Sequence, residues 1–109
     1  MPRPIAEEIA EERARQDAKW GEQNHPSAFL GDPDKVCRAH GLPTEAEAKA
    51  RCEQRAASGT CTWSDIAVEE LAEAVAAAAA GDIDAARSEL VQTTAVLVQW
   101  IESIDRNRT

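Results

Sequence analysis

Apolar residues recur along this chain at intervals of three and four rather than at every second position. That period is typical of an amphipathic α-helix, because residues three and four apart share one helix face. Aromatic residues that favour strands are scarce, since Tyr is absent and Phe occurs once. The pattern therefore predicts an all-α protein.

Start and stop signals place the first two of four predicted helices. The first runs from about Pro4, which suits a first helical position, to about Lys19. The second begins at Thr44, which forms a Thr-x-x-Glu capping box with Glu47, and ends at about Ala57 before Ser-Gly. Between them lies a long connection that we expect to be irregular. Its turn-forming residues are Gly21, Pro26, Gly31, Pro33, Gly41 and Pro43.

The third and fourth helices are predicted to form a hairpin. The third starts near residue 62 or 63 and runs through an alanine block to Gly81. Asp82 caps the fourth, which extends from Ile83 to about Ile104. Because only one or two residues separate the two helices, they must fold back antiparallel to each other.

The predicted fourth helix is apolar over much of its circumference, so we expect it to be buried on more than one side. Its main stripe comprises Ile83, Ala86, Leu90, Leu97, Ile101 and Ile104, and Val91, Val96, Val98 and Trp100 broaden it. The core is nevertheless thin, because half of the 44 apolar residues other than cysteine are alanine. A small chain with such a core gains stability by packing against a second copy, which predicts a homo-oligomer.

Length and charge narrow the function further. With 109 residues the chain has room for a single domain, residues 1–109. Its net charge of -8 argues against nucleic acid and against anionic membrane surfaces as partners. No apolar run reaches the roughly 18 residues of a membrane span, and the charged start does not resemble a signal peptide. We therefore expect a cytoplasmic protein.

The three cysteines are expected to be reduced, buried thiols. Cys37, Cys52 and Cys61 are odd in number, and no secretion signal is present. With His40 they could also supply four zinc ligands, as in a zinc-stabilised adaptor, but the spacing is not that of two close pairs. A disulfide from Cys52 to Cys61 or Cys37 is the other alternative.

The candidate chemistry lies in acidic residues on the predicted hairpin. Glu70 and Glu73 are three apart and share a helix face. Glu73 and Glu89 each lie eight residues from Gly81, and Glu70 and Gln92 each lie eleven from it. Positions at equal distance from a hairpin turn lie at matching heights, so these two pairs are expected to face each other. The count does not fix the side of the helix, but Leu90 and Thr93 on the facing side allow Glu89 to point inward.

Carboxylates held this close repel one another and are costly to ionise in an apolar groove. A divalent cation resolves that conflict, and oxygen ligands alone suit Mg²⁺ or Mn²⁺. The alternative is a solvated acidic helix face without a ligand.

Two stretches resemble a known family. EELAE at 69–73 and ELVQ at 89–92 resemble the EExxE and ExxD signature of the MazG-like all-α nucleoside triphosphate pyrophosphohydrolases. RQDAKWGEQNHP at 15–26 is similar to the corresponding region of small MazG-like proteins of bacteriophages and actinobacteria. The resemblance implies a four-helix MazG-like bundle of antiparallel helices, dimeric or tetrameric, that uses Mg²⁺.

The resemblance also implies roles for the acidic residues. Glu70, Glu73 and Glu89 would bind the metal, and Glu69 would assist as a base or as a support behind the ligands. Glu69, Glu70 and Glu73 are therefore the candidate catalytic residues. Gln92 stands where the family has Asp, so it would offer the metal a neutral carbonyl oxygen. Asp65, one turn before Glu69, is a further acid that could compensate.

Four residues around the end of the first helix are candidates for binding the nucleotide. Trp20 could stack on a base, and Lys19 could pair with a phosphate. Gln16 and Gln23 could bind base or sugar edges. The alternatives are a buried anchoring role for Trp20 and a solvated side chain for Lys19.

The expected activity is conversion of a (deoxy)nucleoside triphosphate to its monophosphate and pyrophosphate, with Mg²⁺ or Mn²⁺ as cofactor. A homodimer or homotetramer is the expected assembly. The competing interpretation is a non-catalytic helical oligomer that acts as a nucleotide sensor or a protein-interaction module, and Gln92 is the feature that favours it.

Overall fold

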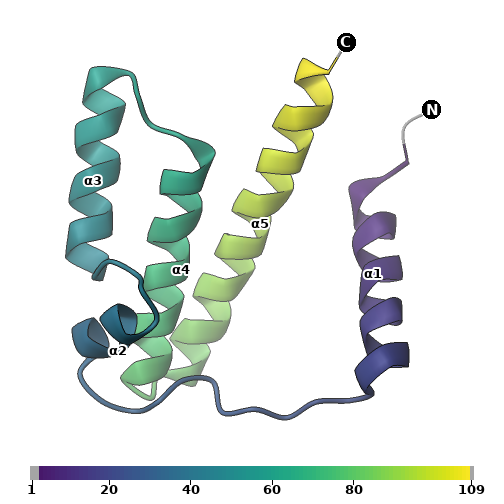
Figure 1. The fold of residues 1–109 in the computed structure, drawn as a ribbon, viewed down its shortest axis with the longest axis horizontal. Helices are drawn as coiled ribbons and strands as arrows, with labels where there is room; N and C mark the ends of the chain where they lie inside the picture. Colours follow the sequence, from purple (N-terminus) through teal and green to yellow (C-terminus); the bar gives the residue numbers. More distant parts are fainter. Residues whose placement is uncertain (1–2, 109) are drawn as a thin grey trace.

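A computed structural model describes residues 3–108 of the chain, and over that range it contains five α-helices and no strand (Figure 1). The all-α prediction is therefore confirmed. The helices are α1 (Ile5–Trp20), α2 (Pro33–Ala39), α3 (Glu45–Ser58), α4 (Trp63–Ala79) and α5 (Ile83–Asn107). None of these five helices is long and apolar enough to cross a membrane.

The helix α2 is the one that the sequence pattern missed, because it lies inside the connection expected to be irregular. Its start carries ordinary signals: the Asp32 side chain accepts hydrogen bonds from the backbone N–H groups of Asp34 and Lys35, and Pro33 occupies the first turn. Residues 21–32 remain irregular, as expected.

The starts of α3 and α4 follow the capping signals. Thr44 Oγ1 accepts a hydrogen bond from Glu47 N at 3.2 Å, which confirms the predicted start of α3. The helix α4 begins with a reciprocal capping box, in which Thr62 Oγ1 accepts from Asp65 N and an Asp65 carboxylate oxygen accepts from Thr62 N.

The helices α4 and α5 form the predicted antiparallel hairpin (Figure 1). Gly81 turns the chain with a φ of 80°, in the left-handed region that glycine adopts at little cost. Asp82 then caps α5 by accepting a hydrogen bond from Ala85 N at 3.1 Å. The turn therefore sets the register between the two helices.

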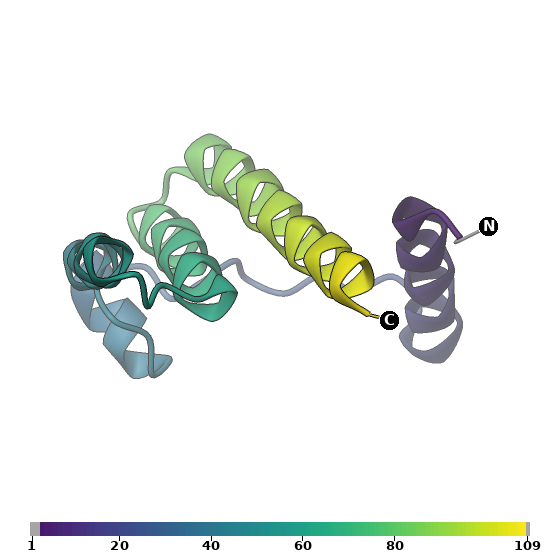
Figure 2. The same cartoon turned by 90° about the horizontal axis from the view of Figure 1, so that it is seen from above.

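The packing centres on α4, which contacts α5 on one side and α3 and α2 on the other. The buried apolar residues are small: Val36, Cys37, Ala48, Cys52, Ala72, Ala74, Ala76, Ala78, Ala79 and Ala86. Figures 1 and 2 both show α1 standing apart from α5, joined to the rest by the irregular segment. The expected thin core is confirmed, and Trp63 and Trp100 are only half-buried.

The prediction that the α5 stripe is buried on more than one side is wrong within this chain. Ala86 and Thr93 are the buried residues of α5, and its leucines and isoleucines are exposed. Val96, Val98 and Trp100 are half-buried. The physical reason is that α4 covers only one side of α5. The chain is correspondingly flat, with extents of 46 × 43 × 21 Å (Figure 2).

Candidate metal centre

Three glutamates gather where α4 and α5 lie side by side. Glu70 and Glu73 are almost one turn apart on α4, and Glu89 extends from α5. One carboxylate oxygen from each lies within 4.8 Å of the other two. Within residues 3–108, this trio is the one group of three or more acidic, histidine or cysteine side chains close enough to share a metal ion.

The trio contains buried polar atoms that lack partners. Oε2 of Glu70 and Oε2 of Glu89 are both buried, and neither has a hydrogen-bond partner. An unpaired buried polar atom is costly, and an ionised carboxylate costs more. Such atoms are rare in folded proteins, so two in one cluster favour a partner that the packed side chains do not supply, either a proton or a cation.

The same crowding perturbs the protonation of the trio. Burial, a hydrogen bond with Glu89 and the charge of Glu70 raise the pKa of Glu73 to about 7. Burial and then the charges of Glu89 and Glu69 raise the pKa of Glu70 above its ordinary value. In both cases desolvation is the larger cause and like-charge repulsion adds to it.

A pocket of about 440 Å³ opens beside the trio and is strongly acidic. Its lining residues are Pro33, Glu45, Glu73, Ala76, Ala77, Ala80, Asp82, Ala85 and Glu89. Burial raises the pKa of Glu45 of α3 as well, and the negative charges of Glu89 and Asp34 add to that rise. Glu45 is therefore electrostatically coupled to the trio through Glu89. No lysine or arginine is among the lining residues, so an anion could bind here only together with a cation.

The arrangement suits a hard divalent cation. Oxygens that share an octahedral Mg²⁺ lie about 3 to 4.2 Å apart, because each ligand is about 2.1 Å from the ion. The spread of the three carboxylate oxygens is compatible with that geometry after small side-chain adjustments. Carboxylate oxygen is also the ligand type that Mg²⁺ and Mn²⁺ prefer.

The other two acidic-motif candidates lie outside the trio. Gln92 is exposed on α5. Glu69 is half-buried and faces Cys52 of α3, where burial and hydrogen bonding with Glu69 raise the pKa of the thiol to about 12. The hairpin thus brings Glu70, Glu73 and Glu89 together and leaves Glu69 and Gln92 outside the cluster.

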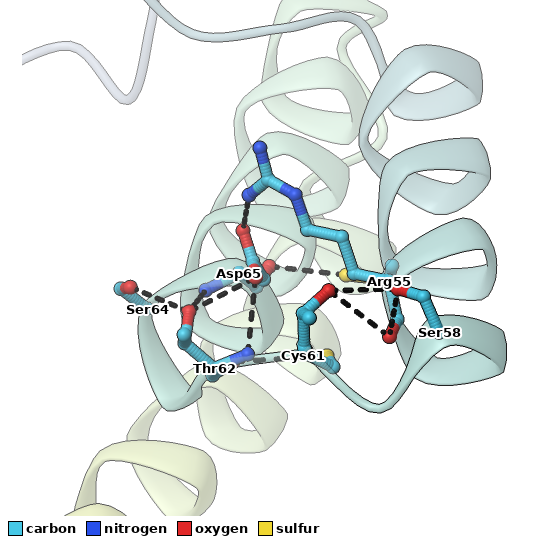
Figure 3. A network of polar contacts seen from close by, with 8 residues as sticks. Arg55, Ser58, Cys61, Thr62, Ser64 and Asp65 are labelled. Atoms are coloured by element: carbon cyan, nitrogen blue, oxygen red, sulfur yellow. Dashed lines mark hydrogen bonds and ion pairs between the residues drawn. The ribbon is translucent and has the colours of Figure 1, made fainter.

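Asp65 caps the start of α4 and does not take part in the trio. Figure 3 shows its carboxylate bound to the backbone and hydroxyl groups of Thr62 and paired with Arg55 of α3. These hydrogen bonds and the arginine hold its pKa below the ordinary value, the Thr62 backbone most of all. The suggestion that Asp65 compensates at the metal site is wrong, because its oxygens are already bound.

The candidate nucleotide-binding residues lie on a different part of the molecule. Gln16, Trp20 and Gln23 line a hollow of about 340 Å³ at the end of α1, together with Arg13, Asp17 and Gly21. Trp20 is 57% exposed, which excludes a buried anchoring role, and Lys19 Nζ lies 4.7 Å from the centre of its ring. No α1 residue lines the acidic pocket.

The cysteines are confirmed as free thiols, with Cys37 and Cys52 buried and Cys61 half-buried. Cys37 Sγ donates to Ala72 O at 3.6 Å, and Cys52 Sγ donates to Asp65 O at 3.2 Å. Both contacts join the α2–α3 side to α4, so these thiols act as small core residues.

Glu45 is the residue near the site that sequence reasoning missed. Its one local signal is its place in the first turn of α3, directly after the cap Thr44. Only the packing of α3 against α4 brings that turn to the acidic pocket.

No family model, curated protein or solved structure matches the chain. The MazG-like resemblance therefore has no support from these comparisons, and the case for a function depends on the geometry of the trio and its pocket.

Proposed function

We propose that the protein is a metal-dependent nucleotide pyrophosphohydrolase of the MazG-like kind. It converts a (deoxy)nucleoside triphosphate to the monophosphate and pyrophosphate. Glu70, Glu73 and Glu89 hold Mg²⁺ or Mn²⁺. The observation that carries the proposal is the pair of buried, unpartnered carboxylate oxygens within a trio that a single cation can span.

Because the pocket is negatively charged, it can bind a polyphosphate substrate only when the cation is also bound. Four acidic residues in and around the trio repel an anion, and no basic side chain lines the pocket. A bound divalent cation supplies positive charge, polarises phosphate oxygens and lowers the pKa of a coordinated water. The carboxylates of the trio fix its position, and alanines of α4 and α5 line the adjoining wall of the pocket.

The acids of the cluster must be ionised to hold the cation. Glu73 has a pKa of about 7 in the metal-free protein, so near neutral pH it gives up its proton when the cation binds. Glu69 is half-buried one residue before Glu70 and supports the cluster from behind. We assign it the role of base or supporting group.

The hollow at the end of α1 is the proposed nucleoside site. The exposed Trp20 ring offers a stacking face, and Lys19 lies over that ring. Gln16 Oε1 accepts a hydrogen bond from Arg13, and Gln23 Oε1 accepts one from His25 Nε2, so both amide groups are held in place. This hollow and the acidic pocket can bind one nucleotide together only if α1 moves toward the pocket or if α1 of another copy lies beside it. The second arrangement fits the proposed cytoplasmic homodimer or homotetramer.

The test is a panel of common and deoxynucleoside triphosphates scored for pyrophosphate with Mg²⁺ and with Mn²⁺. Release of pyrophosphate is expected from the natural chain and is abolished in Glu70→Ala and Glu73→Ala. Glu102→Gln, an exposed change on α5 away from the trio, is the control and retains activity. A natural chain that is inert on the whole panel overturns the proposal.

The exposed position of Gln92 favours one competing function, a nucleotide sensor or interaction module without turnover. That protein would bind a nucleotide with Mn²⁺ but release no pyrophosphate. Turnover that rises from near zero in Gln92→Asp would assign the natural chain to this second class.

A further inference from the structure

A row of large apolar residues on α5 lies exposed at seven-residue intervals. Ile83, Leu90, Leu97 and Ile104 are 56%, 49%, 43% and 45% exposed, and Ile101 beside them is also exposed. A strict seven-residue spacing keeps residues on one side of a long helix and is typical of a seam between packed helices. We name these five residues the α5 seam.

The seam continues into an apolar groove between α4 and α5. The groove has a volume of about 330 Å³, and its lining residues are Ser27, Ala74, Val75, Ala78, Ile83, Ala86, Arg87 and Leu90. Leu71 of α4 is exposed near the same face. The small alanines of α4 let another helix approach closely, so groove and seam together form one broad apolar face of the hairpin.

The exposed area of the chain is larger than a compact monomer has. Its accessible surface is 7882 Å², against about 5,900 Å² expected for this mass. Its radius of gyration is 15.9 Å, against about 13 Å expected for this length. Part of this excess of about 2,000 Å² belongs to α1, which has no buried residue, and part belongs to the exposed apolar face of the hairpin. A standard interface needs only about 800 Å² from each partner.

No helix within residues 3–108 is suited to cover the seam. The helix α1 has no buried residue, and its large apolar side chains are Ile5, Ile9 and Trp20 among many charged ones. The seam, in contrast, has Arg87 as its one flanking charge on the groove side. A surface this apolar on a chain of net charge -8 matches another copy of itself better than it matches an acidic or basic partner.

We propose that the α5 seam is the interface between two copies of this chain, with the two α5 helices antiparallel about a twofold axis near Thr94. Ile83 then lies against Ile104 of the second copy, and Leu90 lies against Leu97 of the second copy. The groove of each copy receives Ile101 and Ile104 of the other. The two α4–α5 hairpins together form a four-helix bundle.

The position of Arg87 selects the antiparallel arrangement. In a parallel pair, Arg87 of one copy would lie beside Arg87 of the other copy at the seam. That contact joins two like charges and is unfavourable. In the antiparallel pair the two Arg87 residues are separated along the axis by about 20 Å, from a rise of 1.5 Å per residue. Antiparallel helices also place opposite helix ends beside each other.

The inference names the surface of the proposed homo-oligomer and does not depend on hydrolysis. The groove beside the seam and the acidic pocket share no lining residue, because they open on different faces of the hairpin. A dimer without pyrophosphate release would therefore overturn only the proposed chemistry, and an active monomer would overturn only the interface.

The first test is sedimentation equilibrium of Leu90→Glu and Leu97→Glu beside the natural chain. Each buries a charge at the seam, and the dimer dissociation constant is expected to rise at least about thirtyfold. Val91→Glu is the matched control, because Val91 is the neighbouring α5 residue, is 58% exposed and lies off the seam. Helicity by circular dichroism shows that each variant folds. A monomeric natural chain, or equal effects of all three variants, overturns the interface.

The second test is disulfide cross-linking in a Cys61→Ser background, where the two remaining native thiols are buried. Thr94→Cys lies near the proposed axis, so mild oxidation is expected to give a covalent dimer. Ile83→Cys is expected to give none, because its copies are about 30 Å apart in the antiparallel pair. Cross-linking through Ile83→Cys, or none through Thr94→Cys, overturns the proposed arrangement.

Discussion

Glu73 on α4 and Glu89 on α5 meet across the hairpin at the same distance in residues from Gly81. Their carboxylates are close enough that a shared hydrogen bond contributes to raising the pKa of Glu73 to about 7. Two acids in this relationship are stable in one of two forms, with a proton between them or with a cation between them. The next predictions separate those forms.

Removing the charge of Glu73 should weaken cation binding. A site filled at 100 times its dissociation constant adds about 2.7 kcal/mol to the free energy of unfolding. The melting temperature of the natural chain should therefore rise with millimolar Mn²⁺, and Glu73→Gln should lose most of that rise. Differential scanning fluorimetry at several Mn²⁺ concentrations measures it.

Glu102→Gln provides the control for this titration. It removes one exposed carboxylate from α5 and leaves the trio intact, so its Mn²⁺ response should equal that of the natural chain. Equal losses in both variants would mean that Mn²⁺ acts through the overall negative charge rather than through the trio.

The metal-free protein should become less stable as the pH rises from about 4.5 to about 7. The unfolded chain ionises Glu73 near 4.5, whereas the folded chain retains the proton until about 7. Across that window the folded state binds more protons than the unfolded state, so the free energy of unfolding falls as the pH rises. Urea unfolding in a chelator at about pH 5 and about pH 7.5 measures the difference.

In Glu73→Gln the same comparison should give a smaller decrease, because an amide does not ionise. Glu70 and Glu45 also have raised pKa values, so part of the decrease should remain. A decrease as large as that of the natural chain would assign the effect to groups other than Glu73.

The hairpin and the trio could be predicted because they depend on local rules. A one- or two-residue turn forces two helices antiparallel, and equal spacing from Gly81 then places Glu73 and Glu89 at the same height. Gln92 satisfies the same count but lies exposed, because spacing fixes the height of a residue and not the side of the helix on which it lies.

The parts that could not be predicted depend on contacts between distant segments. Glu45 reaches the pocket only because α3 packs on α4, and Asp65 is bound by Arg55 of α3. The apolar stripe of α5 was expected to be covered, because an apolar pattern indicates burial. The pattern does not indicate whether the covering surface belongs to the same chain or to another molecule. The seam shows that limit directly, because none of the five described helices covers it.

Removing the α4 cap should destabilise the fold without affecting the metal. Thr62 Oγ1 accepts the hydrogen bond from Asp65 N at 3.1 Å, and Thr62→Ala leaves that N–H unsatisfied. A lost N-cap costs about 1 kcal/mol in the free energy of unfolding. Urea unfolding measures it, with Ser88→Ala as a control, since Ser88 is an exposed hydroxyl residue inside α5 and caps no helix. Equal losses in both variants would contradict the cap.

Substitution of Gly81 should show how strongly the turn sets the register of the trio. Its φ of 80° lies in the left-handed region, where an added Cβ costs about 1 kcal/mol. Space is not the obstacle, because that Cβ would lie at an ordinary contact distance of 3.8 Å from its nearest neighbour, Leu30 Cδ2. Gly81→Ala should therefore lower the free energy of unfolding, and Gly81→Asn should lower it less, because asparagine tolerates this conformation. Urea unfolding gives the first ranking. If the turn keeps its shape, both variants retain the Mn²⁺ affinity of the natural chain, whereas a loss of affinity in Gly81→Ala alone would show that strain at the turn moves Glu89 away from Glu73.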